Sequence, residues 1–180
     1  MPRLNIPTRD EAPETTHGVL DAIGKQLGFM PNGYRLMASS PAVLTGVTGL
    51  QRELSKTLDA TTRHYISLAV SEVNACAYCV SAHSHVAGTF GKMPAAEIAL
   101  AREGSSSDPK RAAAAQFAKR VTETRGKVTD ADLASVRDAG YTDPQIIEII
   151  ALSVQFLLTN FINNVAETEI DFPESEATVA

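Results

Sequence analysis

The strongest constraint on the fold is a recurring signal for the start of an α-helix. Ser40, Asp108 and Thr142 each stand one or two residues before a proline. Such side chains cap helices, and the first helical turn tolerates proline. Thr142 with Gln145, three residues later, also fits a capping box. Because strand-type alternation is nearly absent as well, the sequence predicts an all-α protein.

Apolar periodicity and capping residues predict a series of helices in one domain. They span residues 15–27, 33–38, 41–56, 60–73, 75–89, 94–103, 109–125, 130–139, 143–155 and 157–168. Asp59 is the expected cap of the fourth helix, and Gly104 and Gly140 suit the left-handed residue after a helix end. We expect a single domain over residues 1–180, with a core at about 15–173 and loose arms at 1–12 and 173–180.

Composition and charge narrow the classes of function. The 180 residues carry 16 Lys and Arg against 21 Asp and Glu, a net charge of −5, and no basic run suited to nucleic acid. The most apolar stretch, residues 146–158, is too short to span a bilayer and predicts a buried helix. The first residues lack the apolar core of a signal peptide. We therefore expect a cytoplasmic protein without membrane or nucleic-acid partners.

A short internal similarity suggests a repeat. Residues 68–71 (Leu-Ala-Val-Ser) and 150–153 (Ile-Ala-Leu-Ser) lie 82 positions apart. At that offset, apolar residues 158, 161 and 165 stand where the first segment has Cys76, Cys79 and His83. One interpretation is a helix-pair scaffold used twice, with chemistry in only one copy. The alternative is a chance match of four residues.

Both cysteines of the chain lie in the motif Cys76-x-x-Cys79-x-x-x-His83. At about 100° per residue, the three side chains share one face of a helix. Thiols on adjacent turns can form a disulfide, and an imidazole one turn beyond Cys79 can accept its proton or stabilise its thiolate. Asn74 is the expected N-cap, which would place both thiols near the positive end of the helix dipole. The motif predicts a dithiol redox centre.

Three other interpretations of the motif compete with this one. A structural zinc site would need His85 as the fourth ligand, but His85 points to the opposite side of the helix from Cys76. The cysteines could also be small buried hydrophobic residues. A thioredoxin-like centre needs a strand before the motif, whereas residues 65–73 have helical periodicity. We therefore expect neither a metal nor a cofactor.

Residues 59–86, with the motif following a helix that ends in Ser-x-x-Asn, resemble the core of the carboxymuconolactone decarboxylase/AhpD superfamily. The similarity is to its AhpD-like, peroxidase-related branch. Supporting pieces are Gly28-Phe-Met-Pro-Asn32, Ser40-Pro41 and Glu169-Ile-Asp-Phe-Pro173, so the resemblance spans roughly residues 15–173. It implies an AhpD-like all-α fold, homo-oligomers built as trimers or hexamers, and reduction of peroxides by the two thiols.

The resemblance also implies roles for individual residues. Cys79 would attack the peroxide, Cys76 would resolve the resulting sulfenic acid as a disulfide, and His83 would belong to a proton relay. The family's relay also uses a glutamate twelve residues before the first cysteine, and this sequence has His64 there. A histidine can pass a proton near neutral pH but does not supply a carboxylate's charge. Glu72 is the nearest alternative carboxylate, unless it is only a solvated side chain.

Two arguments disagree about the nucleophile. The helix dipole favours the cysteine nearer the helix start, Cys76, whereas the imidazole of His83 and the resemblance both favour Cys79. We expect Cys79, because a proton acceptor within reach outweighs a dipole contribution of at most about 2 kcal/mol. His17 and His85 are expected at the surface, without a role in the chemistry.

The favoured function is a thiol-dependent hydroperoxide reductase that uses a small-molecule hydroperoxide and a thiol reductant or redox adaptor protein. One alternative is a decarboxylase or lactone-processing enzyme on the same fold, although such members do not depend on a CxxC pair. The other is a non-peroxidase module for redox-regulated interaction or disulfide exchange. The apolar stretch 146–165 would leave a lone chain with an uncovered surface, which also favours a homo-oligomer.

Overall fold

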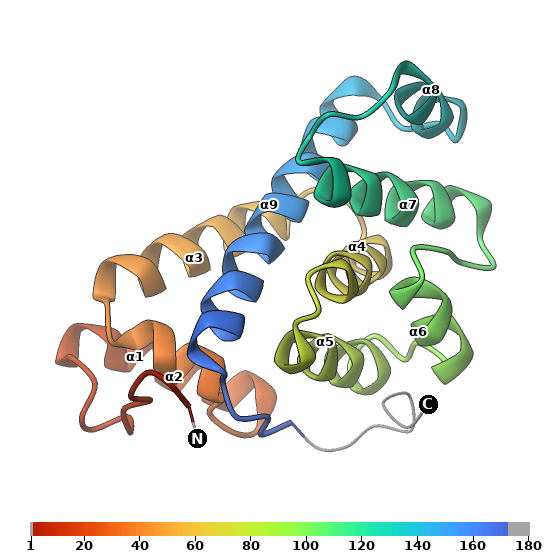
Figure 1. Ribbon diagram of the computed structural model, residues 1–180. Coiled ribbons are helices and arrows are strands. Elements are labelled where there is room, and N and C mark those ends of the chain that lie inside the picture. The colour runs from red at the N-terminus through yellow and green to blue at the C-terminus, as the bar shows by residue number, and fades with distance from the viewer. Residues whose placement is uncertain (1, 173–180) are drawn as a thin grey trace.

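The computed structural model describes residues 2–172, of which about 70% are helical (Figure 1). The helices of this part of the chain are α1 (Glu14–Leu27), α2 (Asn32–Ala38), α3 (Pro41–Leu54), α4 (Ala60–Val73), α5 (Ala77–Thr89), α6 (Ala95–Arg102), α7 (Pro109–Thr124), α8 (Asp130–Asp138) and α9 (Asp143–Ala166). No strand occurs within residues 2–172. The prediction of an AhpD-like, all-α class is confirmed as far as its helical architecture is concerned.

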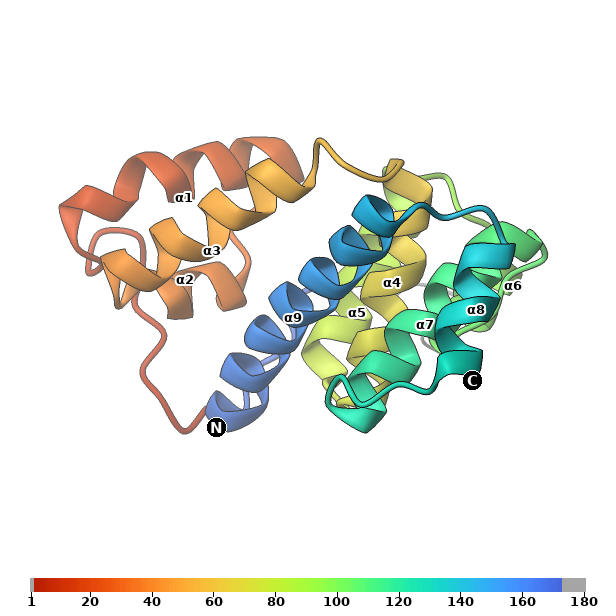
Figure 2. The same ribbon diagram turned by 90° about the horizontal axis from the view of Figure 1, so that it is seen from above.

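Helix α9 runs between two groups of helices. Figure 2 shows α1, α2 and α3 on one side of it and α4 to α8 on the other. Helix α4 is buried on several sides: Ile66 and Val70 pack with Phe117 of α7 and Ile149 of α9, and Leu68 belongs to a second cluster shared with α5 and α6. Burying each such side chain contributes roughly 1.5–3 kcal/mol. This packing fixes α4 between α7 and α9 on one side and α5 and α6 on the other.

The local signals read from the sequence act largely as expected. Asp59 Oδ1 accepts a hydrogen bond from Thr62 N at 3.0 Å, and Asp108 Oδ1 accepts from Lys110 N at 2.9 Å. Thr142 N donates to Gln145 Oε1 at 3.0 Å, which confirms the capping box. Gly104 and Gly140 are left-handed, with φ of 79° and 88°. Ser40 occupies the N-cap position of α3 but forms no side-chain cap hydrogen bond.

The predicted break between residues 155 and 157 is wrong, because α9 is one continuous helix of 24 residues. No glycine or proline occurs between residues 145 and 166, and Leu152, Phe156 and Asn160 continue its buried face across the predicted break. Residues 150–153 therefore lie in the middle of a helix, whereas residues 68–71 lie near the end of α4. The internal similarity does not extend to a second helix pair.

Within the described residues, α9 is also the one helix long and apolar enough to cross a membrane by length and composition. Helix α9 is longer than the apolar stretch of residues 146–158 because the two helices predicted at 143–155 and 157–168 form one helix. Core helices of soluble proteins meet the same criterion, and one side of α9 is buried against its neighbours in this fold. Length and composition are therefore weak evidence for a membrane span.

The N-terminal segment lies against the domain. Arg3 N donates to Ala166 O at 2.8 Å, and Arg35 Nε donates to Pro7 O at 2.7 Å, with Pro7 itself buried. These contacts tie residues 3 and 7 to the domain, while most side chains of residues 2–12 are exposed. A loose N-terminal arm stays a prediction. The other expected arm, residues 173–180, lies outside the described residues.

Candidate functional site

The connection between α4 and α5 sets the position of the two cysteines. Asn74 was the expected N-cap of α5, but it ends α4 instead: its Nδ2 donates to Val70 O at 2.8 Å and to Asn160 Oδ1 at 3.0 Å. Ala75 then adopts a left-handed conformation with φ of 48°. Cys76 becomes the N-cap of α5, and its Sγ accepts a hydrogen bond from Cys79 N at 3.2 Å. Cys76 thus lies before the helix, and only Cys79 lies within it.

The two cysteines form a disulfide, with their Cα atoms 5.2 Å apart. Both are buried, with exposed fractions of 0% for Cys76 and 3% for Cys79. Cys79 lines a cavity of about 240 Å³, and Cys76 is not among the described residues that line it. The two sulfurs therefore differ in access, because a small molecule in the cavity meets Cys79 and not Cys76.

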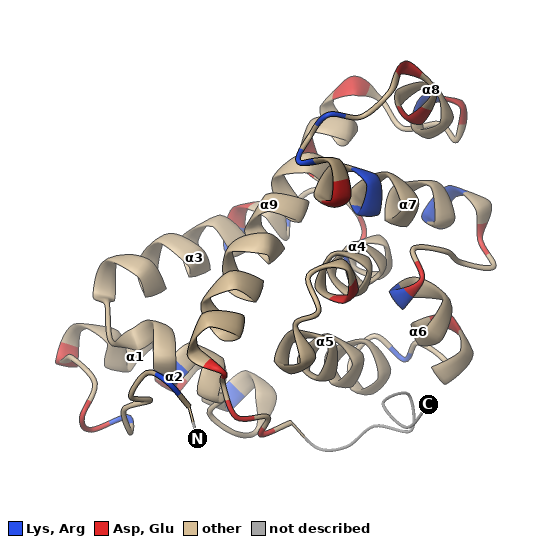
Figure 3. Ribbon diagram, in the orientation of Figure 1, with Lys and Arg blue, Asp and Glu red and all other residues tan. Residues whose placement is uncertain are grey.

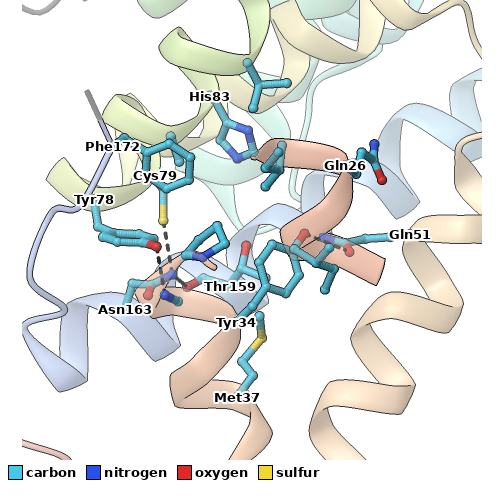
Figure 4. A pocket seen from close by; sticks show the side chains of 16 residues that line it. Gln26, Tyr34, Met37, Gln51, Tyr78, Cys79, His83, Thr159, Asn163 and Phe172 are labelled. Atoms are coloured by element: carbon cyan, nitrogen blue, oxygen red, sulfur yellow. Dashed lines mark hydrogen bonds between the residues drawn. The ribbon is translucent and has the colours of Figure 1, made fainter. Parts of the chain in front are cut away.

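The cavity lies where α1, α2 and α3 face α5 and α9 (Figure 4). Its lining combines apolar and aromatic side chains with a few neutral polar ones: Ile23, Gln26, Leu27, Pro31, Gly33, Tyr34, Met37, Gln51, Tyr78, Cys79, Ala82, His83, Val86, Thr159, Asn163 and Phe172. No Lys, Arg, Asp or Glu occurs among these described residues. Figure 3 likewise shows α5 and most of α9 without charged residues. The cavity suits an uncharged molecule with apolar substituents.

Tyr78, inside the CxxC motif, is fixed by a close contact with α2. Gly33 N donates to Tyr78 Oη at 2.7 Å, and a Cβ atom at position 33 would lie 2.8 Å from Tyr78 Cε1. A side chain at this glycine would therefore displace the tyrosine ring. Burial raises the pKa of Tyr78 far above its ordinary value, so the phenol stays protonated.

The C-terminal segment closes one side of the site. The ring of Phe172 packs edge-on against Phe29 and Tyr78, with centroid distances of 5.1 and 5.7 Å. Asp171 Oδ2 accepts a hydrogen bond from Asn32 N at 2.7 Å. The flanking pieces at residues 28–32 and 169–172, which are far apart in the sequence, therefore meet beside the dithiol.

His83 lies between the cavity at Cys79 and a second cavity of about 190 Å³. Its half-buried ring packs edge-on against Phe156, with centroids 5.1 Å apart. Burial, reinforced by the charge of His64, lowers the pKa of His83 to about 4. His83 is therefore neutral at pH 7 and free to accept a proton.

His64 lines the second cavity together with Arg63, Gln155 and His83. Burial, and then the charge of Arg63, lowers the pKa of His64. A Cβ atom at Gly91 would lie 2.9 Å from His64 Nε2, so this glycine leaves room for the imidazole ring. The structure thus brings His83 to the dithiol cavity and His64 to the far side of His83.

The remaining candidates lie elsewhere. The structure does not bring Glu72 to the dithiol: it is exposed and forms an ion pair with Arg102 at 2.8 Å. His85 is half-buried, with its ring 5.8 Å from that of Phe172, and His17 is half-buried with a ring nitrogen 2.9 Å from Ala12 O. Both histidines were expected at the surface, but each is only partly exposed. The described residues contain no group of three His, Cys, Asp or Glu side chains placed to hold a metal.

Sequence reasoning missed several residues of the site. Asn163 Nδ2 donates to Cys79 Sγ at 3.5 Å, across 84 positions of sequence. Tyr78, Phe172 and Tyr34 supply aromatic lining. The available signal was the group of asparagines at 160, 163 and 164 in an otherwise apolar helix, because a buried amide requires a partner.

Comparison with solved structures shows the same fold. An uncharacterized peroxidase-related protein from Ralstonia eutropha JMP134, described as an alkylhydroperoxidase AhpD core, matches with a TM-score of 0.84 at 23% identity, over 94% of this chain and 92% of its own. A peroxidase-related protein from Silicibacter sp. TM1040 matches with a TM-score of 0.82 at 22% identity, over 99% and 94%. A cysteine-to-alanine variant of the debrominase Bmp8, in complex with 2,3,4-tribromopyrrole, matches with a TM-score of 0.80 at 22% identity, over 94% and 91%.

Comparison of sequences adds a match to a family. No curated protein matches the chain significantly. Residues 41–124, which run from the start of α3 to the end of α7 and include the CxxC motif, match the model of the carboxymuconolactone decarboxylase family. Over residues 41–124 the chain is thus similar to the carboxymuconolactone decarboxylase family, and over nearly its whole length it has the same fold as AhpD-like, peroxidase-related structures.

Proposed function

We propose that this protein is a thiol-dependent hydroperoxide reductase of the cytoplasm. The observation that carries the proposal is the unequal access of the two sulfurs: Cys79 lines an uncharged cavity, while Cys76 is enclosed behind it within disulfide distance. A peroxidase of this type needs one thiol that meets the oxidant and a second that meets only the first. The reducing cytoplasm would supply the thiols that reopen the disulfide.

The proposed reaction begins with the reduced pair. The thiolate of Cys79 attacks one oxygen of the peroxide, the O–O bond breaks, and the alcohol ROH leaves after gaining a proton. Cys79 is then a sulfenic acid. The thiol of Cys76 displaces water from it and closes the disulfide. Two thiols and one hydroperoxide thereby give one disulfide, one alcohol and one water, and an external thiol reductant restores the dithiol.

His83 and His64 are the proposed proton carriers. The neutral imidazole of His83, one turn beyond Cys79, accepts the thiol proton and returns it to the departing alkoxide. A pKa of about 4 makes His83 a weaker base and its imidazolium a stronger acid, so the shift favours the second step, return of the proton, over the first. His64, on the far side of His83, exchanges the proton with the second cavity. In this arrangement a second histidine replaces the family's carboxylate.

The cavity argues against the other functions considered. A decarboxylase or lactone-processing enzyme acts on anionic substrates, and no described residue that lines the cavity carries a positive side chain for a carboxylate. Disulfide exchange with a folded protein requires an exposed sulfur, but Cys76 and Cys79 are 0% and 3% exposed. Both observations favour a small, uncharged reactant.

Reductive dehalogenation is a second candidate, favoured by the shared fold of the debrominase and by the aromatic lining of the cavity. In that reaction an aryl bromide would exchange bromine for hydrogen, the dithiol would be oxidised to the disulfide, and bromide and a proton would be released. Peroxide reduction is preferred because it gives a role to His83 beside Cys79 as well as to both cysteines.

Stopped-flow measurement of thiol loss tests the proposal. We expect a reduced sample to lose two thiols per hydroperoxide, and an organic hydroperoxide to react faster than hydrogen peroxide because the cavity is largely apolar. His83→Ala should move the pH–rate profile to alkaline pH, with a smaller shift for His64→Ala. Thiols that survive organic hydroperoxide but are consumed as a brominated pyrrole releases bromide would establish the second candidate instead.

We further propose that the protein assembles with copies of itself, as a trimer or hexamer, through α9. One face of this helix exposes six large apolar side chains: Ile147, Ile150, Val154, Leu158, Phe161 and Val165. Beside them lies a groove of about 730 Å³ between α4, α7 and α9. Because the same face offers both an apolar ridge and a groove, a second copy can cover it by symmetric packing.

Light scattering at micromolar concentration checks this assembly. We expect a multiple of the 19.2 kDa chain mass for the native protein, and a shift towards the monomer for Leu158→Glu, which places a charge in the ridge. Glu148→Gln, on the same helix but outside the ridge, is the matched control. A native protein that elutes and scatters as a monomer would contradict the proposal.

A further inference from the structure

One buried amide contacts the sulfur at the centre of the site. Asn163 in α9 is 6% exposed, and its Nδ2 donates to Cys79 Sγ at 3.5 Å and to Thr159 O at 2.9 Å. The orientation of the amide is determined by Thr159, because a backbone carbonyl can only accept a hydrogen bond. The nitrogen therefore faces Cys79, as Figure 4 shows.

The other end of the same amide has no partner among residues 2–172. Within this part of the chain, Asn163 Oδ1 is buried without a hydrogen bond, beside Gly33 and the ring of Tyr78. A buried acceptor without a partner is unfavourable and rare in native structures, and a catalytic role is one of its recognised explanations. In this position the amide provides a hydrogen bond to the sulfur of Cys79, while its own oxygen accepts none from the described residues.

The neighbouring asparagines hold α9 against the segment that carries the motif. Asn160 Nδ2 donates to Ser71 Oγ at 3.2 Å, and Asn164 Nδ2 donates to Asn74 O at 2.8 Å. These contacts fix the end of α4 and the connection to α5. The amide of Asn163 is therefore preorganised towards Cys79, since the flanking residues already bind the same two segments.

We propose that Asn163 is a catalytic residue whose amide N–H binds the Cys79 sulfur and favours its thiolate over its thiol. A hydrogen bond to an anion is stronger than one to a neutral sulfur, so the contact selects the charged state. The catalytic significance of this role rests on the proposed peroxidase function, whereas the effect on the thiol does not.

Few other groups near Cys79 can stabilise an anion. The ionisable side chains of the cavity are His83 and Tyr78 on α5 and Tyr34 on α2, all neutral at pH 7. Asp171 in the C-terminal segment, next to Tyr78, can only add negative charge. Cys76 is the remaining titratable neighbour and is the other member of the pair. The N–H of Asn163 in α9 can therefore stabilise a Cys79 thiolate that no positive charge of the cavity stabilises.

Thiol titration in a Cys76→Ser background tests the role of Asn163, because Cys79 is then the only thiol. The ultraviolet absorbance of the thiolate gives the pKa of Cys79, and the rate of alkylation by iodoacetamide at pH 7 gives its reactivity. We expect Asn163→Leu to raise that pKa by about one unit and to slow alkylation about tenfold. Asn163→Asp, which keeps the shape of the side chain, should raise the pKa as well. Gln116→Leu, which removes an exposed amide on α7 outside the site, is the control and should leave the pKa of Cys79 unchanged.

The outcomes separate the two proposals. An unchanged Cys79 pKa in either folded Asn163 variant would overturn the role of Asn163. Asn163→Asp covers the case in which Asn163→Leu fails to fold. A raised pKa in a protein that no hydroperoxide oxidises would uphold the N–H contact and refute the peroxidase function.

Discussion

Replacement of Cys79 by serine is expected to slow peroxide-dependent oxidation of the protein by at least about 100-fold, because a serine hydroxyl is not ionised at neutral pH. Cys76 should not take over, since it is fully buried and does not line the cavity. Cys76→Ser should instead react with peroxide once and stop at a sulfenic acid on Cys79, because no thiol is left to close the disulfide.

Dimedone trapping followed by mass spectrometry measures this difference directly. The adduct should appear on Cys79 in the Cys76→Ser protein and be nearly absent from the Cys79→Ser protein. Cys76 also accepts a backbone N–H as the N-cap of α5, a position that favours a thiolate. An adduct on Cys76 in Cys79→Ser, formed at the wild-type rate, would show that this effect outweighs access and would reverse the two roles.

The second large effect is a loss of stability in acid that depends on His83. Its pKa falls from 6.5 in an unfolded chain to about 4 in the fold. The unfolded state therefore binds more protons between these values, so the free energy of unfolding decreases as the pH is lowered from 6.5 to 4. The decrease attributable to this group is at most about 3 kcal/mol. His64, whose pKa is also lowered, acts in the same direction.

Urea unfolding at a series of pH values, at one fixed protein concentration, measures this effect. The free energy of unfolding of His83→Gln should depend less on pH over the window from 6.5 to 4, because the substituted side chain does not titrate. His17→Gln removes a histidine outside the site and serves as the control. If the wild type and His83→Gln lose stability equally over this window, His83 is not held neutral by the fold.

Features set by neighbours along the chain could be predicted from the sequence. The caps at Asp59 and Asp108 and the capping box at Thr142 depend on residues three or fewer positions away, and all are present. The motif itself is equally local: its spacing of three positions brings Cys76 and Cys79 together, although Cys76 precedes the helix as its N-cap. The structure then shows which of these residues face the cavity.

Features set by distant parts of the chain could not be predicted in the same way. Asn74 has a strong intrinsic preference for an N-cap, yet Asn160 binds its side chain from 86 positions away and leaves the cap to Cys76. Asn163 reaches Cys79 only because α9 packs against α5. Access to each sulfur also depends on the positions of α1, α2 and α3, which local patterns do not specify.

The burial of both sulfurs has a kinetic consequence. If Cys79 is reached only through its cavity, the oxidant and the thiol that regenerates the enzyme must enter the same space at different times. Turnover would then follow a ping-pong course, in which a line of reciprocal rate against reciprocal peroxide concentration keeps its slope as the reductant varies at low concentrations. Excess reductant would also occupy the reduced enzyme and inhibit it in competition with peroxide. The rate would therefore pass through a maximum as the reductant concentration is raised.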